Sequence, residues 1–149
     1  MITKKQNKEQ KNIYANKAFF DRWSKTYDSS PIRFWMRRVQ IPALHEIQFH
    51  HGIKILDLSC GTGELLQNLY QKSKGAAKLY GLDISDDMLQ KARQKLPAEV
   101  VLVQGDVHDL PFEGGEFDYV LSTEAFHHYH SQNQALEEMK RVLKNDGKI

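Results

Sequence analysis

A glycine-rich turn carries the clearest chemical signal in the sequence. An apolar run of strand type at residues 55–58 leads into Ser-Cys-Gly-Thr-Gly at residues 59–63, and a helical pattern begins at Glu64. Gly61 and Gly63 lack a Cβ atom, so the backbone there can adopt positive φ and approach a ligand closely. Open α/β sheets bind ligands at such a turn, at the carboxyl end of the first strand.

The glycine-rich turn lacks the residues of two common nucleotide-binding motifs, which excludes their ligands. A dinucleotide fingerprint needs a third glycine where this chain has Leu66, and the Gly-Lys-Ser/Thr ending of a P-loop is absent. Glu64, in the first helical turn, suits the helix dipole but would repel a phosphate at that place. We therefore expect a nucleoside ligand without phosphates that carries positive charge.

Residues around the next strand end could hold such a nucleoside. Asp83 ends the second predicted strand, where a carboxylate can accept hydrogen bonds from both hydroxyls of a ribose. Ile84 and Met88 follow it and could pack against an adenine face.

The third and fourth predicted strands are followed by further polar groups. Asp106 can accept a hydrogen bond from an exocyclic adenine amine, and the Val107 backbone N–H can donate to a ring nitrogen. Thr123 comes just after the fourth strand, near the expected position of the glycine-rich turn. Simpler roles stay open, because Asp57 could cap a strand end and Asp106 could form a turn.

The elements that must position these residues alternate between strand and helix. The expected strands are residues 54–58, 78–82, 99–103 and 117–122, with a fifth that starts at 148 after a turn at 145–147; the expected helices are about 64–73, 86–95 and 132–143. This alternation predicts βαβ units and therefore an α/β fold, a Rossmann-like parallel-sheet sandwich with N-terminal helices.

Residues 1–51 are expected to form an N-terminal helical lid segment, and residues 52–149 the ligand-binding core. In the first segment, Phe20, Trp23 and Tyr27 recur at helical spacing. Residues 1–40 hold ten basic and three acidic residues, although the whole chain has a net charge of only +2. Because no nucleic-acid motif accompanies this charge, a solvated helix is favoured over an anionic partner.

Composition excludes several classes of protein. The 149 residues, 40% hydrophobic and 27% charged, fit one globular domain. No apolar stretch is long enough for a membrane span, and the polar N-terminus does not resemble a secretory signal. A single cysteine, Cys60, excludes an internal disulfide and a multi-cysteine zinc site. We expect a cytoplasmic protein.

Taken in order along the chain, these motifs resemble class I S-adenosylmethionine-dependent methyltransferases. The resemblance is closest to the small-molecule branch that includes the ubiquinone/menaquinone C-methyltransferases, and it covers about residues 14–149. The matching segments are 57–63, Asp83, 105–107 with 110–112, 117–122 with His127 and His128, and 141–147. In the last segment, Asn145 and Asp146 replace the usual Pro and first Gly.

This resemblance implies a cofactor, S-adenosylmethionine, and residues that contact it. They are Thr62, Asp83, Asp106, Val107 and Thr123. Gly61 and Gly63 would shape the turn under the methionine part, and Asp57 would brace the turn or reach the amino group through water. The helix with Tyr27 would close over the cofactor.

The implied reaction is in-line transfer of a methyl group to a small-molecule acceptor. Candidates for a general base are His127, His128 and Tyr27. No metal is expected, because the pattern formed by His127, His128 and His130 lacks a usual zinc spacing.

The family fold has seven strands in the order 3-2-1-4-5-7-6, whereas this chain stops where the fifth begins. Strand four, with Val120 and Leu121, would then be an open edge. Either the chain is a fragment of a longer protein or another subunit, such as the second copy in a homodimer, covers that edge.

Other functions stay open at this point. A non-catalytic S-adenosylmethionine-binding module or pseudoenzyme that needs a partner chain is the main alternative. Leu66 and Glu64 disfavour a nicotinamide-dependent oxidoreductase. A nucleic-acid methyltransferase is disfavoured because residues 122–125 read Ser-Thr-Glu-Ala where the amino-methylating branch has Asn/Asp-Pro-Pro-aromatic.

Overall fold

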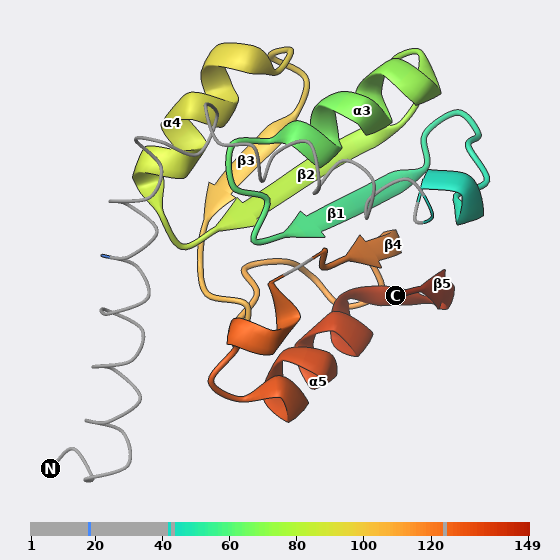
Figure 1. The fold of residues 1–149 in the computed structure, drawn as a ribbon. Coiled ribbons are helices and arrows are strands. Elements are labelled where there is room, and N and C mark those ends of the chain that lie inside the picture. The colour runs from blue at the N-terminus through green and yellow to red at the C-terminus, as the bar shows by residue number, and fades with distance from the viewer. Residues whose placement is uncertain (1–17, 19–41, 43, 124) are drawn as a thin grey trace, which may run out of the picture.

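The computed structural model describes residues 44–123 and 125–149, together with Ala18 and Pro42. The described residues contain one parallel five-stranded sheet with the order β3-β2-β1-β4-β5 (Figure 1). Its strands are β1 (Lys54–Leu58), β2 (Lys78–Asp83), β3 (Val101–Gln104), β4 (Phe117–Leu121) and β5 (Leu143–Lys148). This topology confirms the predicted Rossmann-like α/β fold.

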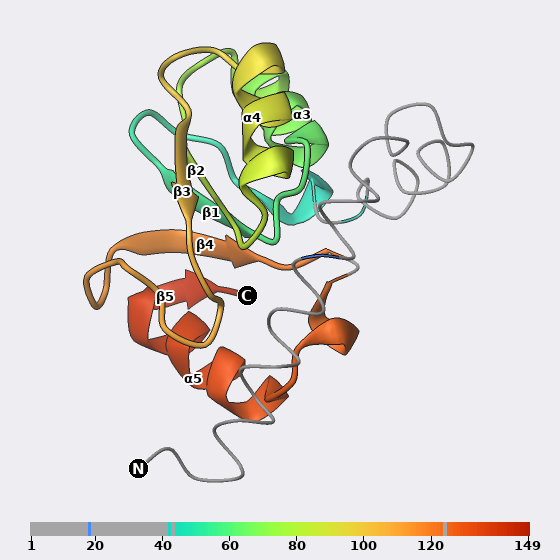
Figure 2. The same ribbon diagram turned by 90° about the vertical axis from the view of Figure 1, so that its left-hand side faces the viewer.

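Helices cover both faces of the sheet. α3 (Glu64–Ser73) and α4 (Asp86–Lys95) lie on one face, and η1 (Phe126–His128) and α5 (Gln132–Val142) lie on the other (Figure 2). Successive strand residues point to opposite faces. Ile55 therefore packs in the cluster with α3 and α4, whereas Leu56 and Leu58 pack in the cluster with α5.

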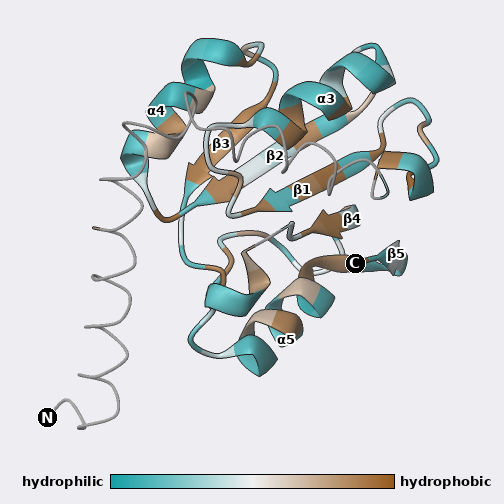
Figure 3. Ribbon diagram, viewed as in Figure 1, coloured by the Kyte–Doolittle hydropathy of each residue, from teal (hydrophilic) through white to brown (hydrophobic). Residues whose placement is uncertain are grey.

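Burial on both faces explains why the strands read as continuous apolar runs. Figure 3 shows apolar residues along β1, β3 and β4 and many hydrophilic residues in the helices, whereas β5 is largely hydrophilic. Ser85 starts α4 as predicted, because its hydroxyl accepts a hydrogen bond from Met88 N–H at 3.2 Å. None of the helices in the described part of the chain is long and apolar enough to cross a membrane.

The predicted first residue of the fifth strand was wrong. β5 begins at Leu143, directly after α5, and includes the residues 145–147 that were expected to form a turn. A Cβ on Gly147 would lie 3.1 Å from the Phe117 carbonyl oxygen, so glycine permits the close approach of the two strands. The pairing is irregular between Phe117 and Tyr119, which accommodates this polar segment.

Strand four is therefore not an open edge, contrary to the prediction. β5 pairs with β4 on one side and β1 pairs with it on the other. Val120 and Leu121 are buried at 0% and 8% exposure. The edges of the described sheet are β3 and β5.

The bounds of β1, α3 and α4 are as predicted, and the remaining bounds differ from the predicted ones by one or two residues. β3 begins at Val101, because Val100 N–H donates to the Pro97 carbonyl at 3.1 Å and closes a turn before it. β4 and α5 each end one residue earlier than expected. The predicted helix with Tyr27 lies outside the described residues, but Ile47 is buried in the core cluster under α3 and α4.

The amino ends of three strands are joined by ion pairs, which we call the amino-end ion pairs. Lys54 Nζ lies 3.1 Å from Glu116 Oε1, and Lys144 Nζ lies 2.7 Å from Asp118 Oδ1. The second oxygen of Asp118 accepts a hydrogen bond from Lys54 N–H at 2.8 Å. These contacts fasten β1, β4 and β5 at the end opposite the glycine-rich turn.

Candidate cofactor site

The glycine-rich turn connects β1 to α3 at the carboxyl end of the sheet. Gly61 and Gly63 have φ angles of 54° and 79°, in the left-handed region that favours glycine. A Cβ on Gly63 would also lie 2.7 Å from Leu96 Cδ1 and 3.2 Å from Ala92 Cβ. Backbone conformation and packing beside α4 therefore both require glycine at position 63.

Asp83 fastens this turn to the end of β2. Its Oδ2 accepts a hydrogen bond from Gly61 N–H at 2.8 Å, and its Oδ1 accepts one from Ser85 N–H at 2.9 Å. The side chain is only 6% exposed. A carboxylate oxygen can accept more than one hydrogen bond, and a carboxylate at the end of the second strand is the type of group that binds the hydroxyls of a ribose.

Asp57 is a buried carboxylate near the end of β1. It is 2% exposed, and no hydrogen bond to its side chain occurs within the described part of the chain. Burial raises the pKa of Asp57 well above its usual range, and the nearby Asp83 raises it further. A buried acid of this kind is costly without a cationic or hydrogen-bond-donating partner. The turn thus fits a ligand with a positively charged group.

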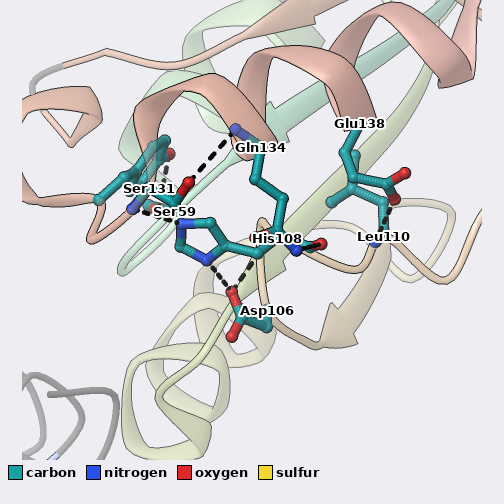
Figure 4. Close-up of polar contacts among 8 residues, drawn as sticks. Ser59, Asp106, His108, Leu110, Ser131, Gln134 and Glu138 are labelled. Atoms are coloured by element: carbon teal, nitrogen blue, oxygen red, sulfur yellow. Dashed lines mark hydrogen bonds and ion pairs between the residues drawn. The ribbon is translucent and has the colours of Figure 1, made fainter. Parts of the chain in front are cut away.

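Asp106 follows β3 and forms a close pair with His108 (Figure 4). Asp106 Oδ1 accepts a hydrogen bond from His108 N–H at 3.0 Å and lies 2.5 Å from the ring Nδ1. Partial burial pushes the pKa of Asp106 upward, but the hydrogen bonds from His108 outweigh it and lower the pKa overall. The acid is therefore held in its ionised form.

A tyrosine hydroxyl bridges the ends of β1 and β4. Tyr129 Oη lies 3.1 Å from Ser59 Oγ and 2.9 Å from Ser122 Oγ. Ser59 has a φ of 56°, an uncommon conformation for a residue with a side chain. Burial raises the pKa of Tyr129, so its hydroxyl stays protonated. The bridge fixes the glycine-rich turn relative to the segment after β4.

Sequence reasoning missed His108, Tyr129, Ser59 and Ser122. A usable signal existed for the two serines, because each directly follows a strand whose carboxyl end lies at the site. For His108 the signal was its position two residues after Asp106, a spacing at which the two side chains can form a hydrogen bond. Tyr129 had no such signal, because its partners are 70 and 7 residues away in sequence.

The other predicted contacts lie at this end of the sheet with different exposure. Thr62, Met88 and Val107 are buried, at 1%, 3% and 7% exposure, and Val107 packs in the core cluster with α5. Ile84 and Thr123 are half-buried. Their roles as cofactor contacts stay predictions.

The candidate bases are only partly described. His127 and His128 are exposed, with ring centroids 3.9 Å apart. Burial and the neighbouring His127 both lower the pKa of His128. Tyr27 lies outside the described residues. Within residues 44–123 and 125–149, no group of three or more His, Cys, Asp or Glu side chains could hold a metal ion.

Comparison with known protein families identifies the family to which this chain belongs. Residues 56–149 match the model of a methyltransferase domain family. The chain belongs to this methyltransferase family. The predicted resemblance is thereby confirmed, and S-adenosylmethionine is the cofactor that the family membership identifies.

The relatives of this methyltransferase-family chain are longer than the chain itself. Demethylmenaquinone methyltransferase from Staphylococcus aureus strain MRSA252 is 32% identical over 153 residues, which cover 100% of this chain and 62% of that protein. The chain thus spans less than two thirds of the curated relatives it matches.

Solved structures share the fold. One is from the complex between the Haloferax volcanii Trm112 methyltransferase activator and a protein assigned as a methyltransferase, with a TM-score of 0.78, 31% identity, and coverage of 86% of this chain and 57% of that one. Another is a Methanococcus maripaludis protein assigned as an S-adenosyl-L-methionine-dependent methyltransferase, with a TM-score of 0.74, 25% identity, and coverage of 85% and 60%.

Proposed function

We propose that the protein transfers a methyl group from S-adenosylmethionine to a small-molecule acceptor. The observation that carries this proposal is the buried Asp83 carboxylate, bonded to the Gly61 N–H at 2.8 Å, beside the buried Asp57 carboxyl group, whose side chain has no hydrogen-bond partner among residues 44–123 and 125–149. Two acids at the carboxyl end of β1 and β2 suit a ligand with a diol and a positive charge.

In this proposal, Asp83 binds the ribose hydroxyls and Asp57 faces the cationic amino-acid part of the cofactor, directly or through water. Asp106 accepts from the adenine amine, and the Val107 N–H donates to the ring. Further proposed contacts are Gly61, Thr62, Gly63, Ile84, Met88 and Thr123.

When bound, S-adenosylmethionine supplies a methyl group on a positively charged sulfur. The chain's contribution is alignment and exclusion of water. The Tyr129 bridge supports this role, because it fastens the glycine-rich turn to the segment after β4. If the acceptor needs a base, His128 is suited to it, because its lowered pKa keeps the imidazole neutral. His127 and Tyr27 are the other candidates.

The acceptor proposed first is a demethylated quinone of the kind named for the Staphylococcus aureus relative. A cytoplasmic location is part of the proposal, supported by the single Cys60, which is a free thiol. If the protein forms a homodimer, β5 rather than β4 is the edge that a second copy would pair with.

The test is transfer of a labelled methyl group from S-adenosylmethionine to demethylmenaquinone, with the already methylated quinone as the blank. We expect label in the quinone with the wild-type chain and none with Asp83→Ala. Binding of the cofactor without transfer to this or other small-molecule acceptors would favour the non-catalytic module. A folded chain that neither binds nor transfers would overturn the proposal.

A further inference from the structure

The pair formed by Asp106 and His108 has a defined proton arrangement. His108 is 8% exposed, between Asp106 and the start of α5 (Figure 4). Its Nε2 accepts a hydrogen bond from Ser131 N–H at 3.3 Å, so Nε2 carries no hydrogen. The proton of the neutral ring is therefore on Nδ1, which donates to Asp106 Oδ1 at 2.5 Å.

The position of the ring is fixed from several sides. Gln134 Nε2 donates to the His108 carbonyl at 2.9 Å, which joins its backbone to α5. The His130 ring lies over the imidazole with centroids 3.6 Å apart, and the Tyr129 ring stands nearly perpendicular to the imidazole with centroids 5.9 Å apart. His108 therefore presents one N–H to one carboxylate oxygen, with little freedom to turn.

This arrangement makes the two oxygens of Asp106 unequal. Both hydrogen bonds from His108 fall on Oδ1. Oδ2 receives no hydrogen bond from residues 44–123 or 125–149, and the side chain is 29% exposed. Because Asp106 is held ionised, Oδ2 can accept a hydrogen bond but cannot donate one.

An oxygen that only accepts distinguishes two kinds of purine. The amine of an adenine donates to it, whereas the carbonyl oxygen of a hypoxanthine at the same position would face it with a second acceptor. A site with a hydrogen-bonding group held in a fixed position binds less tightly a ligand that leaves this group unpaired.

We propose that His108 is a positioning residue that fixes Asp106 as an acceptor and so sets the preference of the site for an aminopurine over an oxopurine nucleoside. This inference rests on the proposed function, because it assumes that Asp106 faces the purine. Adenosine and inosine forms of the same cofactor product differ at the 6-position, which Asp106 would contact, and at N1, which accepts a hydrogen bond in adenine and carries a hydrogen in hypoxanthine. The N1 difference is the same for the wild type and for every His108 variant, so a change of the ratio between these proteins reports the contact of Asp106.

Calorimetric titration of the full chain with S-adenosylhomocysteine and with S-inosylhomocysteine tests the inference. The measured quantity is the ratio of their two dissociation constants. In the wild type we expect the adenosine form to bind about 10- to 100-fold more tightly, because in the inosine form an acceptor at the 6-position would face the half-buried Asp106 acceptor and the hydrogen on N1 would face the Val107 N–H. A variant that only loosens the fold would weaken both ligands alike and leave the ratio unchanged.

Two amide substitutions separate the roles of the ring nitrogens. His108→Asn places an amide N–H where Nδ1 lies and should keep most of the ratio. His108→Gln places the amide where Nε2 lies, so it cannot donate to Asp106 in the same way, and the ratio should fall to a few-fold. His51→Gln, an exposed histidine before β1, is the matched control and should leave both constants unchanged.

Each outcome has a distinct meaning. A ratio that stays at the wild-type value in both the Asn and the Gln variant would overturn the role of His108 while leaving the proposed function intact. A wild-type chain that folds, as judged by circular dichroism, but binds neither ligand would overturn the proposed function itself.

Discussion

Acidic side chains at the two ends of the sheet have opposite surroundings. At the amino ends of β1, β4 and β5, Glu116 and Asp118 pair with Lys54 and Lys144. At the carboxyl ends, Asp57 and Asp83 are more deeply buried, and Asp83 accepts hydrogen bonds from the backbone N–H groups of Gly61 and Ser85.

The contrast separates groups that stabilise the fold from groups that prepare a site. The paired lysine and acid side chains are 20–39% exposed, where an ion pair contributes at most about 1 kcal/mol. Asp57 raises the free energy of the unliganded fold, because burial raises its pKa and so opposes its ionisation. A cationic ligand would relieve this cost. At the carboxyl end, the buried acid therefore favours ligand binding at the expense of the stability of the unliganded protein, unlike the acids of the amino-end ion pairs.

The largest effect is expected from Asp83→Ala. It removes the proposed ribose acceptor and also the two hydrogen bonds that hold Gly61 and Ser85. We expect S-adenosylhomocysteine affinity, measured by calorimetry, to fall at least about 100-fold, which corresponds to about 2.7 kcal/mol. Asp118→Ala removes a carboxylate from the amino end and is the matched control; an equal loss of affinity there would contradict the comparison.

Asp57→Asn is expected to weaken the binding of S-adenosylhomocysteine about 10-fold and to stabilise the unliganded protein by about 1–3 kcal/mol. The amide has nearly the same size as the carboxylate but carries no charge that must be buried. Urea unfolding with and without S-adenosylhomocysteine measures both effects. Lower stability of the unliganded variant at neutral pH would show that Asp57 is not an uncompensated charge.

The same residue predicts a pH dependence. Folding raises the pKa of Asp57 above its ordinary value of 3.8, so in this range the folded state binds the proton more tightly than the unfolded state. The contribution of Asp57 to stability therefore falls as pH rises from that value, and the loss is complete above the folded pKa. The difference in unfolding free energy between Asp57→Asn and wild type should grow over this window; a pH-independent difference would contradict the assignment.

Tyr129→Phe should have an intermediate effect. It removes a hydroxyl bonded to Ser59 and Ser122, and we expect a loss of about 1–3 kcal/mol in the free energy of unfolding, since two partners lose a half-buried hydrogen bond. Tyr70→Phe is the control, because the Tyr70 hydroxyl makes no hydrogen bond within the described part of the chain. Similar losses in both variants would mean that the bridge contributes nothing specific.

The smallest effect is expected at the amino end. Lys144→Met removes the partner of Asp118, whose pKa is lowered because the bonds from Lys144 and Lys54 outweigh partial burial. The stability due to this pair is present above the ordinary carboxyl pKa and is lost as pH falls. We expect at most about 1 kcal/mol of destabilisation at pH 7 and no change in ligand affinity. A loss of ligand affinity in this variant would contradict the conclusion that the amino-end ion pairs stabilise the fold without contributing to the site.

Local sequence patterns predicted the alternation of strands and helices and the position of the acids, whereas the strand order followed from the family resemblance. The apolar run before Asp57 and the alternation of strands and helices reflect burial on both faces, which is encoded locally. The extent of β5 was not predictable in this way, because its polar residues join the sheet through pairing with β4 and the space that Gly147 leaves.

The sequence predicted which residue types lie at the site better than it predicted the hydrogen bonds that they form. Asp57, Asp83 and Asp106 were expected at strand ends, where local sequence places them. That Asp83 bonds Gly61, and that Asp106 bonds His108, depends on side-chain orientation. The Tyr129 bridge depends on the path of the chain after β4, which no local pattern reports.

A crystal structure with S-adenosylhomocysteine tests the central claim most directly. The account predicts both ribose hydroxyls within about 2.6–3.2 Å of the Asp83 carboxylate, with the amino-acid part beside the glycine-rich turn. A ribose bound away from Asp83, with that carboxylate unchanged against Gly61, would contradict it.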